Sequence, residues 1–200
     1  MAHRLYLLRH GSTGADGRFI GTTDLPLSEE GQGQVKAVRS VVESAAIDAI
    51  LCSPMTRCVQ TLDLLNVSVA SETIEELREI DFGLWENLDF ASVNSQYPDD
   101  VSDWMKSPET FSFPRGESLP GFLKRLRKVK KIIEDHPDDK VLVVCHGGVI
   151  RYMICLFLHL PLSSAMLFTV FPGCCTRIDI HDQGGVLTGF NLSGEVNGQN

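Results

Sequence analysis

Two short apolar runs, each followed by a His-Gly pair, constrain the fold of this chain most strongly. Residues 5–8 are followed by Arg-His-Gly at 9–11, and residues 141–145 by His-Gly-Gly at 146–148. Apolar runs of this length that end at Gly are typical of buried strands. In open α/β sheets, ligands bind at the carboxyl ends of the strands. The sequence therefore predicts two strands that bring two His side chains to one edge of a sheet.

The rest of the chain alternates between strand-like and helix-like patterns. Ser28 and Ser118 each precede a helical pattern and are suited to cap it. Alternating strands and helices favour a mainly parallel sheet with helices on both faces. We therefore expect an α/β fold, a three-layer α/β/α sandwich. The expected helices are 28–46, 55–65, 118–136 and 148–158, and the further strands are 47–52, 67–74, 176–180 and 186–191.

The regular pattern weakens over residues 84–116. This segment holds both tryptophans and three of the nine prolines, and single helical turns are expected at 90–96 and 100–106. Irregular aromatic segments between regular elements often cover a site. We therefore predict a small irregular or helical cap inserted into a single domain that spans residues 1–200.

The charge of the chain limits its partners. A net charge of −8 argues against nucleic acid or an anionic membrane surface. The predicted helix 118–136 has one basic face, which we interpret as solvated surface. That face consists of Lys124, Arg125, Lys128 and Lys131. A small anionic molecule is the expected partner, and a homodimer is left open.

Neither a membrane span nor a metal site is expected. The most apolar stretch, residues 149–171, is interrupted by Arg151, His159 and Pro161, so it predicts a buried helix rather than a span of about 20 apolar residues. The six cysteines show no C-x-x-C pair and no zinc-like spacing. We interpret them as reduced, structural thiols, and since no secretory signal is expected, the predicted location is cytoplasmic.

Charged side chains gather at the predicted carboxyl edge of the sheet. Arg9 and His10 follow the first strand, Arg57 follows the second, Glu79 the third, and His146 the fourth. The planar guanidinium of Arg suits phosphate oxygens. The N-termini of helices near residues 55 and 147 would add backbone N–H groups to an anion site. This combination indicates a site for a phosphoryl group.

One of these residues can carry out the chemistry. An unperturbed imidazole has a pKa of about 6.5 and is mostly neutral at pH 7, and nearby guanidiniums lower that pKa. A neutral His10 can therefore attack phosphorus. The leaving oxygen then needs a proton, which Glu79 can donate, with Asp81 as the alternative.

Five segments of the chain carry motifs that occur together in one family. They are Arg-His-Gly at 9–11, Asp-Leu-Pro-Leu-Ser at 24–28 with Gly31, Ser-Pro-x-x-Arg-x-x-Gln-Thr at 53–61, Leu-x-Glu-x-x-x-Gly-x-Trp-Glu at 77–86, and His-Gly-Gly-x-x-Arg at 146–151. This set resembles the histidine phosphatase superfamily, which contains the cofactor-dependent phosphoglycerate mutases. The resemblance covers nearly the whole chain.

The resemblance implies a metal-free, cofactor-free, two-step phosphatase mechanism. His10 would be the phosphohistidine nucleophile, Glu79 the proton donor and His146 a further catalytic residue. Arg9, Arg57 and His146 would bind the phosphoryl group. Further phosphate contacts are expected at Gly11, Thr13 and Gly147, and substrate contacts at Arg18, Gly21 and Thr22.

Segments 17–21 and 113–118 are most similar to the α-ribazole phosphatase branch, which dephosphorylates α-ribazole 5′-phosphate during assembly of the cobalamin nucleotide loop.

The chain departs from the family pattern at Ser12 and Asp16. Asp16 would repel a phosphate dianion, so we expect it to point away. Arg115 replaces a Gly and is interpreted as surface, with a substrate contact as the alternative.

Other functions remain open on the sequence. A phosphatase for sugar phosphates or phosphorylated proteins would carry the same core motifs. A phosphoglycerate mutase usually has His-Tyr-Gly after its Glu, where this chain has Ile-Asp-Phe-Gly at 80–83. A non-catalytic phosphate-binding module usually lacks the nucleophile or an Arg, and this chain retains both.

Overall fold

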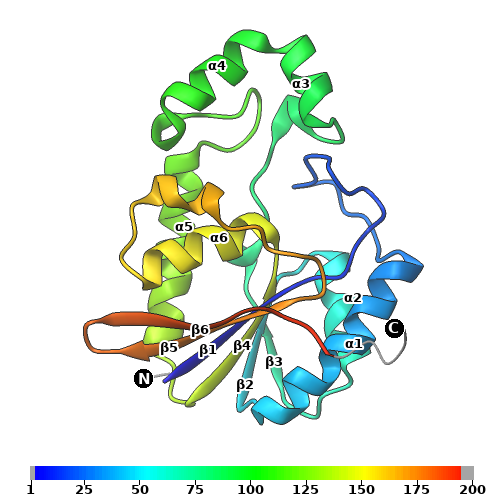
Figure 1. Ribbon diagram of the computed structural model, residues 1–200, viewed down its shortest axis with the longest axis vertical. Helices are drawn as coiled ribbons and strands as arrows, with labels where there is room; N and C mark the ends of the chain where they lie inside the picture. The colour runs from blue at the N-terminus through cyan, green and yellow to red at the C-terminus, as the bar shows by residue number, and fades with distance from the viewer. Residues whose placement is uncertain (1–2, 195–200) are drawn as a thin grey trace, which may run out of the picture.

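A six-stranded sheet forms the centre of the computed structural model, which describes residues 3–194 (Figure 1). The strand order is β3-β2-β4-β1-β5-β6. The first four of these strands are parallel, whereas β5 and β6 are antiparallel to their neighbours. The mainly parallel sheet predicted from the sequence is confirmed. The strands are β1 (Arg4–Arg9), β2 (Ala49–Cys52), β3 (Ser71–Thr73), β4 (Lys140–Cys145), β5 (Cys175–His181) and β6 (Gly184–Leu192).

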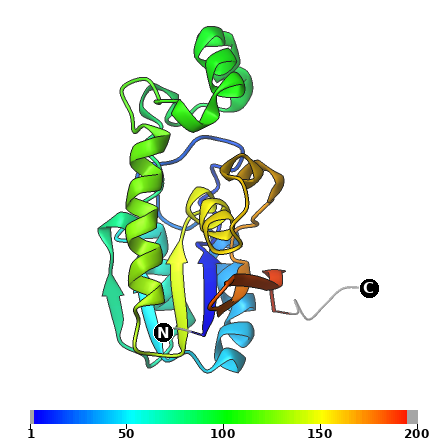
Figure 2. The same cartoon turned by 90° about the vertical axis from the view of Figure 1, so that its left-hand side faces the viewer.

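Helices cover both faces of this sheet, so the α/β/α arrangement is confirmed (Figures 1 and 2). Side chains alternate between the two faces because successive residues of a strand point in opposite directions. Leu5 and Leu7 of β1 belong to the core beneath α5 and α6, and Tyr6 and Leu8 to the core beneath α1 and α2. The four helices are α1 (Glu29–Ala45), α2 (Thr56–Leu65), α5 (Leu119–Glu134) and α6 (Gly147–Phe157).

The element boundaries follow local chemistry. Ser28 and Ser118 cap α1 and α5 as predicted, each accepting a hydrogen bond from the N–H three residues later. The predicted strand 67–74 is wrong in length, since only Ser71–Thr73 is a strand. Asn66 ends α2 in the left-handed conformation. The Val side chains that follow it pack on the core, and β2 offers only three partners in this pairing.

A helical cap stands over the carboxyl edge of the sheet, at the top of Figure 1. Its two α-helices lie close to where the sequence predicts helical turns. Trp85 is fully buried and contacts the rings of Phe19, Trp104, Phe111 and Phe113 at centroid distances of 5.2–5.6 Å. These aromatic contacts hold the cap to the loop after β1. The cap elements are the 3-10 helix η2 (Gly83–Trp85), α3 (Phe90–Gln96), α4 (Pro98–Lys106) and the 3-10 helix η3 (Pro108–Thr110), and further 3-10 helices are η1 (Glu75–Leu77) and η4 (Leu162–Leu167).

Over residues 3–194, no helix combines the length and the apolar character that crossing a bilayer would need. The apolar segment predicted to be a buried helix contains α6, most of whose side chains are buried.

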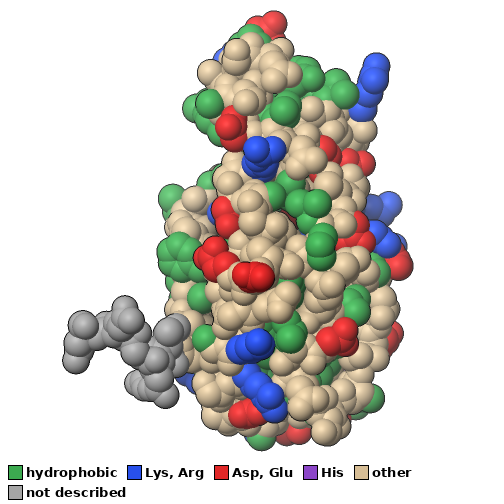
Figure 3. Space-filling model, turned by 90° about the vertical axis from the view of Figure 1, so that its right-hand side faces the viewer, with side chains coloured by type: hydrophobic (Ala, Val, Ile, Leu, Met, Phe, Trp, Pro, Cys, Tyr) green, Lys and Arg blue, Asp and Glu red, His purple; other side chains and the backbone are tan. Residues whose placement is uncertain are grey.

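The six cysteines are unpaired. Basic and acidic side chains are interspersed on the face drawn in Figure 3.

Candidate active site

A cavity of about 360 Å³ lies between the carboxyl edge of the sheet and the cap. Its polar walls come from the end of β1, the loop that follows it, the start of α6 and the segment around Glu79. Arg9, His10, Glu79 and Gly147 line this catalytic cavity. The parallel strands have therefore brought residues far apart in the sequence to one place, as predicted.

His10 presents one free ring nitrogen. Its Nδ1 lies 2.7 Å from the carbonyl oxygen of Gly11. A carbonyl can only accept, so Nδ1 carries the proton and donates, and Nε2 keeps its lone pair. Burial, followed by the positive charges of Arg9 and Arg57, lowers the pKa of His10 to about 3. The imidazole is therefore neutral at physiological pH.

This lowered pKa predicts a loss of stability in acid. The unfolded chain has a His pKa of about 6.5, so between that pH and about 3 the unfolded state binds a proton that folded His10 does not. The contribution of His10 to stability should be fully present well above pH 6.5 and should be lost progressively as the pH falls from there toward about 3. Urea midpoints measured from pH 4 to 8 should show a smaller fall for His10→Asn than for the wild-type chain. Equal slopes would contradict a neutral, buried His10.

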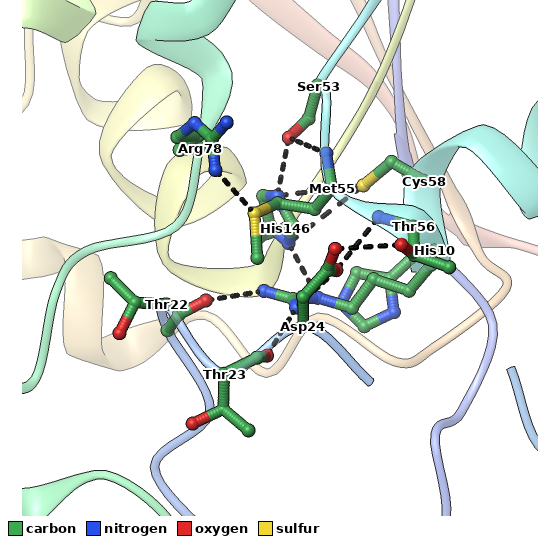
Figure 4. Close-up of polar contacts among 12 residues, drawn as sticks. His10, Thr22, Thr23, Asp24, Ser53, Met55, Thr56, Cys58, Arg78 and His146 are labelled. Carbon is green, nitrogen blue, oxygen red and sulfur yellow. Dashed lines mark hydrogen bonds and ion pairs between the residues drawn. The ribbon is translucent and has the colours of Figure 1, made fainter. Parts of the chain in front are cut away.

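His146 lies directly behind His10, with 5.2 Å between ring centroids (Figure 4). Its Nδ1 accepts a hydrogen bond from Nε of Arg57 at 3.2 Å. Its Nε2 therefore carries the proton and donates to Ser53 Oγ at 2.8 Å. Burial and the neighbouring positive charges hold the pKa of His146 well below its usual value. His146 is fully buried and does not line the catalytic cavity, so its predicted contact with phosphate stays a prediction.

Arg57 is also fully buried behind the cavity. Its Nη1 donates to the carbonyl of Thr23 at 3.0 Å and its Nη2 to that of Gly21 at 2.9 Å. Asp24 lies 4.0 Å away and accepts two hydrogen bonds from Thr56 at the start of α2. Two further N–H groups of the guanidinium have no acceptor among the described residues. Arg57 thus connects the 21–24 loop to His146.

Glu86 holds this same loop from the opposite side. Its carboxylate accepts hydrogen bonds from the backbone N–H groups of Gly21, Thr22 and Thr23, at 2.9–3.3 Å, and from Thr23 Oγ1 at 2.6 Å. Neither Gly21 nor Thr22 lines the cavity, so the expected contacts of these two residues with substrate stay predictions. Both belong to the frame of the site. The sequence reasoning missed Glu86, although the Trp85-Glu86 pair in the fourth motif could have indicated it.

Replacing Glu86 by Gln is expected to weaken both the fold and the site. One carboxylate oxygen becomes an NH₂ group that faces N–H donors, which should cost about 2–3 kcal/mol. The freed loop should then release Arg57, and kcat/KM should fall about 10-fold or more. Urea unfolding and steady-state kinetics measure the two effects. As a control, Glu43→Gln removes a surface pair with Arg39 and should cost less than about 1 kcal/mol. If Glu86→Gln behaves like the control, the loop does not depend on Glu86.

Glu79 is fixed by the start of α6. Its Oε2 accepts a hydrogen bond from the N–H of Gly148 at 2.8 Å, and its Oε1 accepts one from the N–H of Ile80 at 3.1 Å. The carboxylate therefore lies at a helix N-terminus, where the helix dipole favours negative charge. Glu79 and His10 both line the catalytic cavity.

Arg125 of α5 holds the backbone next to Glu79. Its guanidinium donates to the carbonyls of Glu76, Arg78 and Glu79 at 2.6–2.9 Å and to both carboxylate oxygens of Glu117 at 2.9 Å. All five of its N–H groups are thereby used. The interpretation of Arg125 as solvated surface is therefore wrong. Helical periodicity indicates that a face is polar but not which backbone groups pack against it.

Arg125→Lys is expected to impair turnover while retaining the charge. Lysine has three donors and no planar fork, so it cannot replace these contacts. The Glu79 backbone should shift, lowering kcat about 10-fold, and stability should fall by about 1–3 kcal/mol. Lys128→Met, at a mostly exposed position on the same helix, is the control. A stability loss with unchanged kcat would limit Arg125 to a structural role.

The loop after β1 contains an unexpected anion. Asp16 lines the cavity, so the expectation that it points elsewhere is wrong. The hydroxyl of Ser12 donates to its carboxylate at 2.7 Å and holds it there. Thr13 and Arg18 also line the cavity, and their contacts with phosphate and substrate stay predictions. The cavity thus combines several cations with a second carboxylate besides Glu79.

Two guanidiniums in the cavity have unused donors. Arg9 donates through Nη1 to the carbonyl of Val170 at 2.7 Å, but its Nε is buried without a partner among the described residues. Arg151 lines the same cavity and has a buried Nε in the same state. Buried donors of this kind need an acceptor, which a bound phosphoryl oxygen or a water can supply. Arg151 was not predicted as a site residue, although it is the Arg of the last motif.

Three further residues considered from the sequence, Asp81, Arg115 and Gly11, do not line the cavity. Asp81, the alternative acid, accepts a hydrogen bond from the N–H of Gly83 at 2.8 Å and does not line the cavity. Arg115 is exposed in a turn with a φ of 58°, as its interpretation as surface residue predicts. Gly11 packs against α1, where an added Cβ would come within 3.0 Å of Gly31 Cα. Gly11 thus allows close packing of the loop on α1, and its predicted contact with phosphate stays a prediction.

Across residues 3–194, no group of three or more His, Cys, Asp or Glu side chains is placed to hold a metal ion. The polar groups in the cavity are guanidiniums, one imidazole, carboxylates and backbone N–H groups. This donor set fits an anionic phosphoryl group.

Comparison with known proteins gives a consistent result. The chain matches the histidine phosphatase superfamily (branch 1) over residues 5–193. It is 30% identical over 182 residues to the adenosylcobalamin/alpha-ribazole phosphatase of Salmonella typhimurium, covering 88% of this chain and 90% of that protein. It is 29% identical over 195 residues to phosphoserine phosphatase 1 of Hydrogenobacter thermophilus, covering 95% and 92%. The solved alpha-ribazole phosphatase of Shigella flexneri has a TM-score of 0.85 and 26% identity, over 98% of this chain and 100% of that chain. Relatives of similar identity thus have different substrates in their names.

Proposed function

This chain belongs to branch 1 of the histidine phosphatase superfamily, and on that premise we propose that it hydrolyses phosphomonoesters through a phosphohistidine formed on His10. The observation that carries the proposal is the free Nε2 lone pair of a neutral His10 in a cavity lined by Arg9 and Glu79. A nucleophile, a cation and a proton donor thus line one cavity.

In the first step, the Nε2 lone pair of His10 forms an N–P bond while the P–O ester bond breaks. In the substrate complex Glu79 carries a proton, because the bound phosphate dianion disfavours a second negative charge beside it, and it gives this proton to the leaving oxygen, so an alcohol departs. The carbonyl of Gly11 accepts from Nδ1–H and stabilises the positive charge that develops on the ring. Arg9 and Arg151 neutralise the phosphoryl oxygens. A bound phosphoryl group also offsets the positive field that lowers the pKa of His10.

In the second step, water replaces the alcohol. Glu79, now a carboxylate, accepts a proton from this water as its oxygen forms a bond to phosphorus. The N–P bond breaks, its electrons return to Nε2, and inorganic phosphate leaves. Glu79 is then protonated again, so one residue serves as acid and base in turn.

The preferred substrate in this proposal is α-ribazole 5′-phosphate. Besides its charged groups, the cavity is bordered by aromatic side chains, which suit the benzimidazole ring of α-ribazole. Phosphoserine is a small zwitterion and offers no group to pack against such walls. The aromatic lining consists of Phe19, Phe82, Phe90, Trp104, Phe113, Phe122 and Tyr152.

A panel of phosphomonoesters tests the reaction and the substrate separately. We expect kcat/KM for α-ribazole 5′-phosphate to exceed the values for phosphoserine, 3-phosphoglycerate and a phosphopeptide by about 100-fold, as burial of one aromatic group allows. Faster turnover of phosphoserine would favour the activity named for the Hydrogenobacter relative and overturn the proposed substrate. Absence of turnover on every substrate would overturn the proposed reaction.

A further inference from the structure

A second cavity of about 210 Å³ adjoins the catalytic one. Trp104, Tyr152 and Met166 belong to the walls of both cavities. The remaining walls come from the end of α4, from η3, from the start of α5 and from η4. We call this second space the annex. It lies on the far side of the three shared side chains from His10.

The annex is lined mostly by apolar groups. Met105 and Leu162 are examples, and Glu109 is the single charged residue in its walls. No cation lines it, in contrast to the catalytic cavity with its several guanidiniums. An anionic ligand would meet no counter-charge here and would be repelled by Glu109. The annex therefore suits an uncharged, apolar group.

Exposed methionines provide a second, independent observation. Met105 and Met166 are 72% and 56% exposed, although both line the annex. Flexible thioether side chains adapt to ligands of differing shape. A ligand seated here would remove their apolar surface from water, which is favourable in proportion to the area buried.

We propose that the annex binds the distal, uncharged aromatic or alkyl part of a leaving group whose phosphoryl end lies against Arg9 and His10. This inference rests on the proposed function and extends it to substrate size. The shared walls favour this occupant, because Trp104, Tyr152 and Met166 border both the cavity that holds His10 and the annex. The two spaces together fall within the range of roughly 300–1,000 Å³ that is typical of small-molecule sites.

Binding of n-alkylphosphonates tests this inference without requiring catalysis. Their C–P bond is not a phosphoester, and their headgroup is the same at every chain length. In calorimetric titrations from ethyl to decyl, below micellar concentrations, we expect Kd to fall about three- to fourfold for each methylene that becomes buried. This gain in affinity should continue for alkyl chains that are longer than the catalytic cavity alone can hold.

Two variants test whether the alkyl chain of the phosphonate occupies the annex. Ser163→Trp fills the annex from η4, and Leu162→Glu adds a carboxylate to its wall; both should abolish the gain for the longer phosphonates. Ser95→Trp, on an exposed face of α3 outside both cavities, is the matched control and should retain it. A Kd independent of length in the wild-type chain, or a full gain in both annex variants, would overturn the inference. Turnover of phenyl phosphate tests the proposed function separately, so the two failures are distinguishable.

Discussion

Replacing His10 by Asn is expected to lower kcat by about 10⁴-fold or more on every phosphomonoester, as removal of a covalent nucleophile does elsewhere. The Asn amide can still donate a hydrogen bond to the Gly11 carbonyl, as Nδ1–H does now. It has no lone pair that can form the N–P bond. The loss should therefore come from chemistry rather than from collapse of the buried site.

The covalent intermediate offers a direct measurement. After rapid mixing with ³²P-labelled substrate and alkaline quenching, the wild-type chain should retain label that is released in acid, as expected of phosphohistidine. The His10→Asn chain should retain none. His181→Asn, at an exposed position in β5, is the matched control and should keep both turnover and label. Label on the His10→Asn chain would assign the nucleophile to another residue.

The sequence was sufficient to predict the sheet and the convergence at its edge for a simple physical reason. The apolar runs of β1 and β4 are recognisable because both strands are buried on both faces. Parallel pairing then brings their carboxyl ends together whatever the intervening loops do. The sequence alone therefore predicts that His10 and His146 lie close together.

What could not be predicted depends on hydrogen bonds between distant segments. Gly21 was expected to contact substrate, but its N–H is bound by Glu86 and its carbonyl by Arg57. The periodicity of apolar residues indicates whether a side chain is buried. It does not indicate which backbone group that side chain contacts. Arg125 shows the same limit, since its helical position predicts a polar face and its five donors are used by the Glu79 segment. The frame of the site is thus less visible in the sequence than its reactive residues.

Gly148→Ala is the substitution expected to damage catalysis most without replacing a reactive residue. An added Cβ would come within 3.0 Å of the Glu79 Cδ and closer still to its Oε1. The backbone of α6 accepts Ala without strain, and Ala is favoured over Gly in helices by about 1 kcal/mol. Stability should therefore change little while the Glu79 carboxylate is displaced. Gly33→Ala in α1, where no atom lies within 4 Å of the new Cβ, is the matched control.

The leaving group distinguishes a displaced acid from a blocked cavity. Ethyl phosphate needs a proton on its leaving oxygen, so kcat should fall about 100-fold, at the lower end of what general acid catalysis supplies. p-Nitrophenolate leaves without a proton, so p-nitrophenyl phosphate should lose about 10-fold or less. Equal losses on both substrates would indicate obstruction of the cavity instead.

A double-mutant cycle with Glu79→Gln completes the argument. If Gly148→Ala acts only through the Glu79 carboxylate, adding it to Glu79→Gln should cost ethyl phosphate hydrolysis little more than Glu79→Gln alone, because the acid is already lost. Independent losses that multiply would mean that the added Cβ disturbs a second group besides the Glu79 carboxylate. The cycle therefore tests whether residue 148, the second of α6, must be glycine because any side chain there displaces the Glu79 carboxylate.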